Sequence, residues 1–240
     1  MTNQNARGTP RMVTDVTTRE TNHHEETALD TLLAHYARGA LSAPLHVLVA
    51  SHLEIRPESR RFVGALEGVV ASAIVEEDPV PIGDRDARLA AIFAAEEAGD
   101  TLARPRAAHS AISGDVPHPL ARYLGQSLND VPWRTLLPGV KEYRIEDNEE
   151  GEATLYWIKG GRKMPFHTHE GSEYTLVLKG AFSDLNGHYG RGDIAIADAD
   201  VDHRPIADPD ADCFCFAVTD APLKLTGPIG RIVQRFFIKR

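Results

Sequence analysis

Apolar residues recur at helical spacing through most of the first hundred positions of the chain. Residues 1–21 are the exception, because they are rich in Thr, Asn and Arg and lack any period, which is typical of a disordered tail. Four later stretches show apolar side chains every three or four positions, with Pro or Gly between several of them: Glu25–Ala40, Pro44–His52, Glu58–Glu77 and Asp84–Ala98. The pattern predicts a small four-helix domain over residues 22–98.

The pattern changes in the second half of the chain. Residues 99–117 lose the helical period and collect Pro, Ser and Gly, which is the composition of a linker. Residues 118–240 contain short β-branched and aromatic runs separated by Gly, Asp and Asn: Lys141–Ile145, Ala153–Lys159, Tyr174–Lys179, Asp193–Ala197 and Cys213–Val218. These runs predict an antiparallel barrel or jelly roll, and with the helices they make an α+β chain of two domains.

Composition and charge narrow the class of protein. The 240 residues are 42% hydrophobic and 25% charged, as in ordinary soluble domains. No apolar run is long enough to cross a membrane, and the polar start does not look like a secretory signal, so we expect a cytoplasmic protein. A formal net charge of −9 argues against direct binding of nucleic acid, since phosphate backbones select clustered Lys and Arg.

Candidate metal ligands gather in the predicted β-domain. His167 and His169 alternate along an extended segment, so their side chains share one face, and Glu173 returns beside them after a Gly-Ser turn. His203 on a later strand can close the site. Three imidazoles and one carboxylate suit one divalent metal ion per chain, with zinc as the first choice and iron, manganese or nickel as alternatives.

These residues carry a resemblance to the cupin superfamily. Its first motif reads His-x-His, three or four residues, Glu, six residues and Gly, and here His167, Glu173 and Gly180 fit that spacing. The second motif is represented by its opening Gly192 and by His203, although Asp198 stands where cupins usually have Pro. The resemblance implies that the C-terminal domain is a metal-binding cupin barrel.

The layout of four helices followed by one cupin domain resembles the ChrR-type anti-sigma factors. The shared stretches are His23-His24, Tyr36-Ala-Arg-Gly39, Val49-Ala-Ser-His52, and Cys213-Phe-Cys215 through Thr219-Asp-Ala-Pro222. The resemblance implies that the helical domain holds an extracytoplasmic-function sigma factor. It also implies that the cupin domain senses stress or a small molecule, which makes the protein a regulator of transcription.

One part of the family pattern is broken. In that family a structural zinc in the helical domain is held by an early His and a His-x-x-x-Cys-x-x-Cys motif, and the matching positions here are His24, His52, Arg56 and Ser59. Arginine offers no lone pair to a metal, so we predict that this site is empty. Packing of the helices must then stabilise the domain in place of zinc, unless Arg56 adds an ion pair with Glu25, Glu26 or Glu54. His24 and His52 are then expected to be remnants of the zinc site or capping residues.

Two classes of function stay open. The first is the anti-sigma factor, and the second is a mononuclear metal cupin enzyme, a dioxygenase or isomerase acting on a small oxygenated substrate. The chain shows no nucleophile-base dyad or nucleotide-binding glycine loop, so no catalytic residue is named. Cys213 and Cys215 are either small hydrophobic residues of the barrel or, if accessible and low in pKa, an oxidation-sensitive pair.

Overall fold

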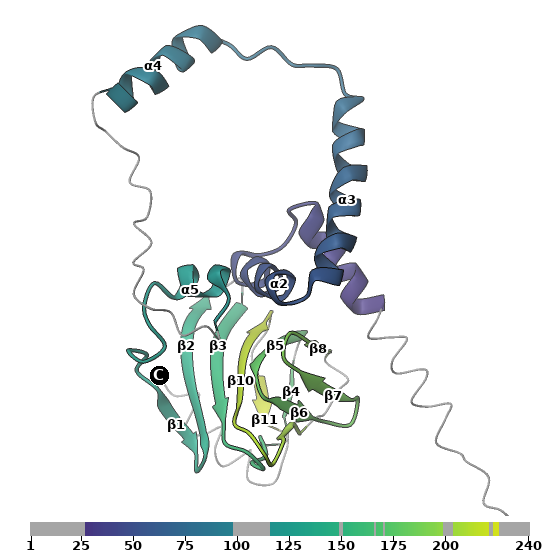
Figure 1. Ribbon diagram of the computed structural model, residues 1–240, viewed down its shortest axis with the longest axis vertical. Coiled ribbons are helices and arrows are strands. Elements are labelled where there is room, and N and C mark those ends of the chain that lie inside the picture. The colour runs from purple at the N-terminus through teal and green to yellow at the C-terminus, as the bar shows by residue number, and fades with distance from the viewer. Residues whose placement is uncertain are drawn as a thin grey trace, which may run out of the picture.

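The computed structural model describes residues 27–97, 116–148, 151–165, 167–169, 171–198, 204–220 and 223–225 (Figure 1). Its first part is helical, with helices at 27–37, α2 (Ala43–Ile55), α3 (Pro57–Val75) and α4 (Arg85–Glu97). They confirm the four predicted helices to within a few residues at each end. Pro44 and Pro57 lie in the first turns of α2 and α3, where a missing N–H leaves no helical hydrogen bond unmade. The predicted tail over 1–21, and the predicted linker except for Val116 and Pro117, lie outside the described residues.

A short helix that the sequence pattern did not predict opens the second part of the chain. This helix, α5 (His118–Leu124), ends at Gly125, whose φ of 65° is the left-handed conformation that favours glycine. The His118 backbone N–H and the His118 Nδ1 atom both bond to the Glu54 carboxylate, the latter at 2.9 Å. Glu54 lies on α2, so this contact holds α5 against the helical part.

The β-structure consists of antiparallel strands in three sheets. The six-stranded sheet has the order β1-β2-β3-β10-β5-β8, a smaller sheet has the order β7-β6-β9, and β11 pairs with β4. The strands are β1 (Arg134–Leu137), β2 (Val140–Asn148), β3 (Gly151–Ile158), β4 (His167–His169), β5 (Glu173–Lys179), β6 (Ala181–Ser183), β7 (His188–Gly190), β8 (Ile194–Ala197), β9 (Ile206–Ala207), β10 (Cys213–Thr219) and β11 (Leu223–Leu225). Five of them match the predicted runs, and the α+β class is confirmed.

Alternation along the central strands gives the six-stranded sheet two different faces. On β10, Phe214, Phe216 and Val218 join one hydrophobic cluster, whereas Cys213 and Cys215 join the other. The cysteine face turns toward the smaller β6 and β7 strands, with Phe182 and Tyr189 in the same cluster. A period of two along each strand therefore sorts side chains between the outside and the inside of the β-domain.

The outer face of the sheet and the first helices share one hydrophobic core. Leu48 and Val49 of α2 are fully buried in the same cluster as Leu155, Leu176 and Phe216 of the sheet. Burying one such side chain stabilises the fold by about 1.5–3 kcal/mol. We call the helix at 27–37, α2, α5 and the strands the body, because these elements exclude water together.

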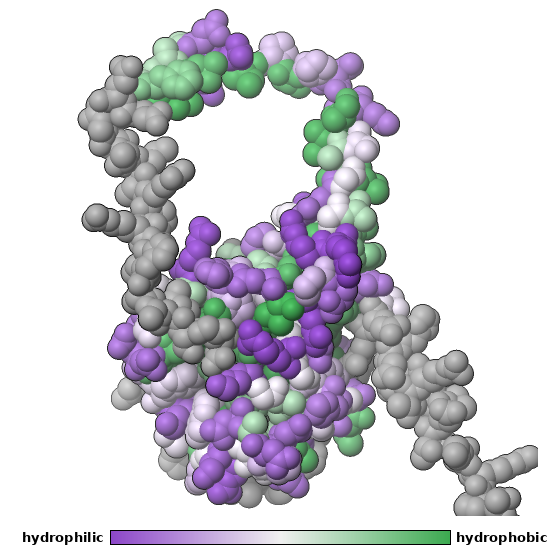
Figure 2. Space-filling view, in the orientation of Figure 1, coloured by the Kyte–Doolittle hydropathy of each residue, from purple (hydrophilic) through white to green (hydrophobic). Residues whose placement is uncertain are grey.

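The remaining helices, α3 and α4, form what we call the arm. Figure 1 shows α3 projecting away from the sheets and α4 lying apart from them. Val63 is the buried residue of α3, near its start. Along the rest of the arm large apolar side chains are exposed, and Figure 2 shows them as green areas over α3 and α4; they include Phe62, Val69, Ile74, Val75, Ile92 and Phe93.

Candidate metal centre

The structure brings two of the four predicted metal ligands together. His167 begins β4 and Glu173 begins β5, and both side chains are buried. The His167 Nε2 atom lies 3.7 Å from the Glu173 Oε2 atom. Since the Gly-Ser turn between the strands reverses the chain, the carboxylate returns beside the imidazole as the motif spacing predicted.

The orientation of the His167 ring suits a metal ligand. Its Nδ1 atom lies 2.9 Å from the Pro165 carbonyl oxygen, which can only accept a hydrogen bond, so Nδ1 carries the proton. In the neutral ring the Nε2 lone pair then points toward the Glu173 carboxylate. Two electron-pair donors that face each other in a buried site fit a cation held between them, and a carbonyl behind the ring is the usual support of a ligating histidine.

The other two predicted ligands are placed only by the backbone or not at all. His169 lies on β4 two residues after His167, but its side chain is outside the described part of the structure, and His203 lies outside it entirely. Among the residues that the structure describes, no group of three or more potential ligands comes together. The complete four-ligand centre is therefore a prediction from the sequence.

Glu173 also belongs to a polar row that crosses the inner face of the sheet. Thr219 on β10 pairs with Glu173 on one side and with Glu152 of β3 on the other. Burial raises the pKa of Glu152, against the opposing effects of its hydrogen bond from Thr154 and the charge of Arg144. This row places a second carboxylate on the same face as the predicted ligands.

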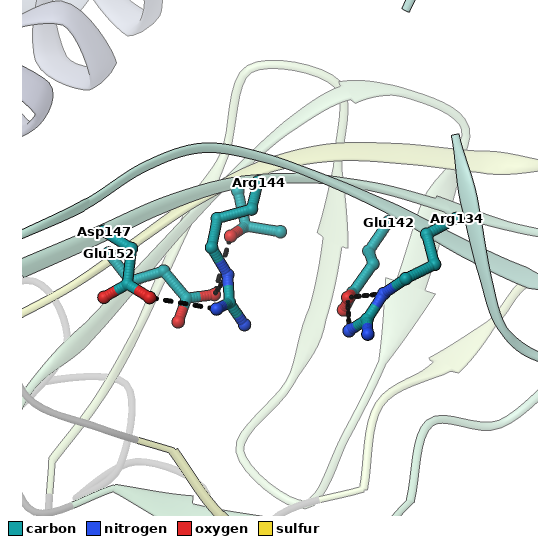
Figure 3. Close-up of polar contacts among 6 residues, drawn as sticks. Arg134, Glu142, Arg144, Asp147 and Glu152 are labelled. Carbon is teal, nitrogen blue, oxygen red and sulfur yellow. Dashed lines mark hydrogen bonds and ion pairs between the residues drawn. The ribbon is translucent and has the colours of Figure 1, made fainter. Parts of the chain in front are cut away.

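Charged residues of β1 to β3 continue this polar face, as Figure 3 shows. Arg134 binds the nearly buried Glu142, and Arg144 contacts Asp147 at 2.9 Å and Glu152 at 3.3 Å. Motif analysis did not find these residues, although charged residues at alternating positions of β2 are an unusual pattern for a strand with a buried face. With Glu173 included, carboxylates outnumber guanidinium groups on this face, which favours a cationic ligand.

A pocket inside the β-domain opens onto the predicted centre. Its lining includes His167, Glu173, Tyr156, Met164 and Cys215. Burial of the phenol, together with the charges of Glu152 and Glu173, raises the pKa of Tyr156 well above its usual value, so this hydroxyl keeps its proton. The Tyr156 O–H is therefore a neutral donor in the lining of this mostly apolar pocket.

The two cysteines are buried neighbours on β10. Their Sγ atoms lie 3.4 Å apart. The hydrogen bond with Cys213, and then burial, raise the pKa of the Cys215 thiol well above its ordinary value. An oxidation-sensitive pair needs accessible thiols of low pKa, so the structure supports the interpretation of these residues as small hydrophobic side chains.

Comparison with known proteins decides the family. A family model described as the ChrR cupin-like domain matches residues 123–222. The anti-sigma-E factor ChrR of Cereibacter sphaeroides is 42% identical over 208 residues, which cover 87% of this chain and 95% of that protein. This chain belongs to the ChrR family. The resemblance predicted from its sequence, including the cupin domain, is confirmed.

Solved structures agree with membership of the ChrR family. The crystal structure of Rhodobacter sphaeroides SigE in complex with the anti-sigma ChrR matches with a TM-score of 0.65 and 42% identity, over 80% of this chain and 96% of that chain. An RmlC-like cupin protein from Ralstonia eutropha matches 43% of this chain and 72% of its own, with 19% identity and a TM-score of 0.36.

Two residues at the positions of the broken zinc motif, His52 and Arg56, contact the β-domain. His52 is buried in the last turn of α2, and its Nδ1 atom lies 2.6 Å from the Gly192 carbonyl oxygen. Arg56 follows α2 and donates a hydrogen bond of 2.5 Å to the Asp193 carboxylate. The His52 ring therefore joins the helical part to the sheet through Nδ1, while its Nε2 atom is buried with no hydrogen-bond partner among the described residues. That His52 is a remnant or a capping residue stays a prediction.

The ion pair of Arg56 also differs from the expectation. Glu54 contacts His118 instead, and Glu25 and Glu26 lie outside the described residues. Besides Asp193, Arg56 lies 3.9 Å from Glu58, which follows it in the chain. Helical periodicity cannot reveal a partner more than a hundred residues away, which is why Asp193 was missed. Ser59 lies half-buried on α3, and His24 lies outside the described residues.

Proposed function

We propose that this chain is an anti-sigma factor that sequesters an extracytoplasmic-function sigma factor with its helical part. The observation that carries the proposal is the arm, whose large apolar residues are exposed although they recur at helical spacing. Val69, Ile74 and Val75 are 69%, 67% and 83% exposed on α3. Soluble proteins rarely leave such a set uncovered unless a partner covers it. The relative of known structure, ChrR, is in complex with SigE, which supports a sigma factor as that partner.

The second helix of the arm offers the sharpest test of this interface. Ile92 and Phe93 of α4 are 62% and 61% exposed, so replacing either by Asp should leave the isolated chain folded. Central apolar anchors contribute about 2 kcal/mol or more to a protein interface. We therefore expect Ile92→Asp and Phe93→Asp to weaken binding of the sigma factor at least about thirtyfold in a titration with purified proteins.

A matched control lies on the cupin domain. Leu185 is 84% exposed, so Leu185→Asp makes the same chemical change at a site away from the arm. This variant should bind the sigma factor as tightly as the unaltered chain. If the unaltered chain binds no sigma factor, or if Phe93→Asp binds as well as Leu185→Asp, the proposed interface is wrong.

We further propose that the cupin domain holds one divalent metal ion, with zinc as the first choice, on His167, His169, Glu173 and His203. The buried pair of His167 and Glu173, and the lone pair that the Pro165 contact leaves on Nε2, support this ligand set. A bound ion supplies a Lewis-acidic centre at which an oxidant or small molecule can act. A stress signal would then alter sigma binding only if it favours one state of the protein over the other.

Elemental analysis of the purified chain beside its His169→Ala variant tests the metal proposal. One zinc ion per chain, reduced in the variant, is the expected result. Iron or manganese, without binding of a sigma factor, would favour the metal cupin enzyme instead. Two zinc ions per chain would contradict the prediction that the site matching His24, His52, Arg56 and Ser59 is empty.

A further inference from the structure

The corner between α2 and α3 sits on one turn of the β-domain. His52 donates a hydrogen bond to the Gly192 carbonyl oxygen at 2.6 Å, and Arg56 contacts the Asp193 carboxylate at 2.5 Å. His52 is 3% exposed, while the side chains of Arg56 and Asp193 are 34% and 41% exposed. Two neighbouring residues of the turn thus contact a residue in the last turn of α2 and the residue that follows this helix.

Gly192 lets the helix approach this closely. Its φ is +91°, which side chains of L-residues rarely adopt, and a Cβ atom there would lie 2.7 Å from both Arg56 Nε and Ile55 Cγ2. The backbone of the turn therefore lies directly against the end of α2. A side chain at this position would force the side chains of Ile55 and Arg56 to move.

The turn itself is held rigidly by the sheet. The second carboxylate oxygen of Asp193 accepts the Gly190 N–H at 2.8 Å, and Val177 of β5 exchanges backbone hydrogen bonds with Gly192 and Asp193 at 2.8 and 3.0 Å. The same two strands, β5 and β8, meet again where Glu173 pairs with Ala197. Glu173 and the turn therefore lie at opposite ends of the same pair of strands.

Arg56 occupies the joint of the helical part. It is the one residue between the end of α2 at Ile55 and the start of α3 at Pro57, and its backbone is extended, with φ −113° and ψ 91°. Rotation about this residue decides where α3 points. Within the described part of the chain, Val63 is the buried residue of α3, and it lies near the start of that helix.

We propose that the contacts of Arg56 with Asp193 and of His52 with Gly192 form a latch through which the cupin domain fixes the direction of the arm. The latch ties the joint between α2 and α3 to a turn whose strands also carry Glu173. Its importance for sigma binding rests on the proposed function, but the latch itself is a property of the free chain. When the latch opens, the arm should sample directions that the closed latch forbids.

Distance measurements on the free full-length chain test this proposal. Spin labels at Ala71→Cys, on the exposed side of α3, and at Leu185→Cys, 84% exposed on the cupin domain, report the direction of the arm. The native cysteines are buried, so the introduced ones should be labelled preferentially. Arg56→Ala and Asp193→Asn should each broaden the distance distribution, and the double variant should broaden it no further. Asparagine keeps an oxygen that can accept the Gly190 N–H, so the turn should survive.

Hydrogen exchange provides a second readout of the same variants. Amides at the end of α2, such as the Arg56 N–H that bonds to His52 O at 2.8 Å, should exchange about tenfold faster in Arg56→Ala, as expected for the loss of one charge-assisted hydrogen bond. Arg60→Ala is the matched control, because it breaks the exposed pair with Glu67 within α3.

The latch is refuted if Arg56→Ala behaves like Arg60→Ala in both measurements, or if the effects of Arg56→Ala and Asp193→Asn add. Sigma binding by the unaltered chain is a separate result, so failure of the latch and failure of the proposed function are distinguishable.

Discussion

The body and the arm both contain helices with apolar residues at helical spacing, but the rest of the chain covers these residues only in the body. α2 buries Leu48 and Val49 against the sheet, whereas α3 and α4 leave Val69, Ile74 and Phe93 in water. Helical periodicity does not distinguish the two cases, because it shows that a helix has an apolar side and not what covers it. In the body the cover belongs to the same chain, and in the arm we propose that it belongs to a partner.

The largest expected effect is the difference in stability between truncating a buried phenylalanine of the body and truncating an exposed phenylalanine of the arm. Phe216 is fully buried in the shared core, and Phe93 is 61% exposed on α4. Phe216→Ala should lower the free energy of unfolding by about 3–5 kcal/mol, because it leaves a cavity, whereas Phe93→Ala should change it by less than about 0.5 kcal/mol. Denaturant titration of both variants measures the difference. Similar losses in the two would contradict the division into body and arm.

A pair of glycines gives the next largest effect. Gly192→Ala adds a Cβ atom against Ile55 and Arg56 at a positive φ, so we expect it to lower the free energy of unfolding by about 1–3 kcal/mol. Gly68 lies within α3, and nothing lies within 4 Å of an added Cβ atom there. Gly68→Ala should leave stability unchanged or raise it by up to about 1 kcal/mol, since alanine favours helix. Thermal unfolding of both variants tests the opposite signs.

The dependence of stability on pH tests the burial of His52. Burial lowers the pKa of His52 below its ordinary value, although the hydrogen bond to the Gly192 carbonyl opposes this. Below about pH 6.5 the His52 imidazole is protonated in the unfolded chain, while in the folded chain it stays neutral down to its lowered pKa. The free energy of unfolding should therefore fall as the pH falls from about 6.5 toward that lowered pKa. His52→Asn keeps a donor near the Nδ1 position and cannot titrate. Its unfolding free energy should vary less between pH 6.5 and 5 than that of the unaltered chain, and equal slopes would contradict the assignment.

The smallest effect is expected from an ion pair confined to the arm. Arg60 and Glu67 lie 3.6 Å apart on α3, with both side chains well exposed. Such pairs contribute about 0–1 kcal/mol, so Arg60→Ala should leave the denaturation midpoint nearly unchanged. A marked loss of stability would show that α3 is held by contacts other than those of Val63 and the latch.

Local signals were enough to predict the long elements and the approach of His167 to Glu173. Apolar patterning located the four helices and five strands, of which all but β8 have seven or more residues, and motif spacing predicted that His167 lies beside Glu173. The strands that were missed have two to four residues, too few to show a period, and α5 has seven residues. The predicted roles of His169 and His203 depend on side chains outside the described residues.

Contacts between distant parts of the chain could not be predicted from such signals. Asp193 was recognised only as the first residue of a predicted strand, and nothing local links it to Arg56, which lies 137 residues earlier. Even the pair of Arg134 and Glu142, only eight positions apart, became visible only once β1 and β2 were placed side by side. Side-chain pairs of this kind can be recognised only when the fold is known. Charged residues at alternating positions of a strand with a buried face nevertheless indicate that a partner for the buried charge exists.

The shared core has a consequence for the order in which the protein is made. α2 leaves the ribosome well before β10, yet Leu48 is covered in the same cluster as Phe216, about 170 positions later in the sequence. Until that strand is synthesised, the apolar side of α2 lacks its final cover and the joint at Arg56 lacks the turn that receives it. A nascent chain therefore passes through a stage in which all of its helices, and not the arm alone, present apolar surface to the cell.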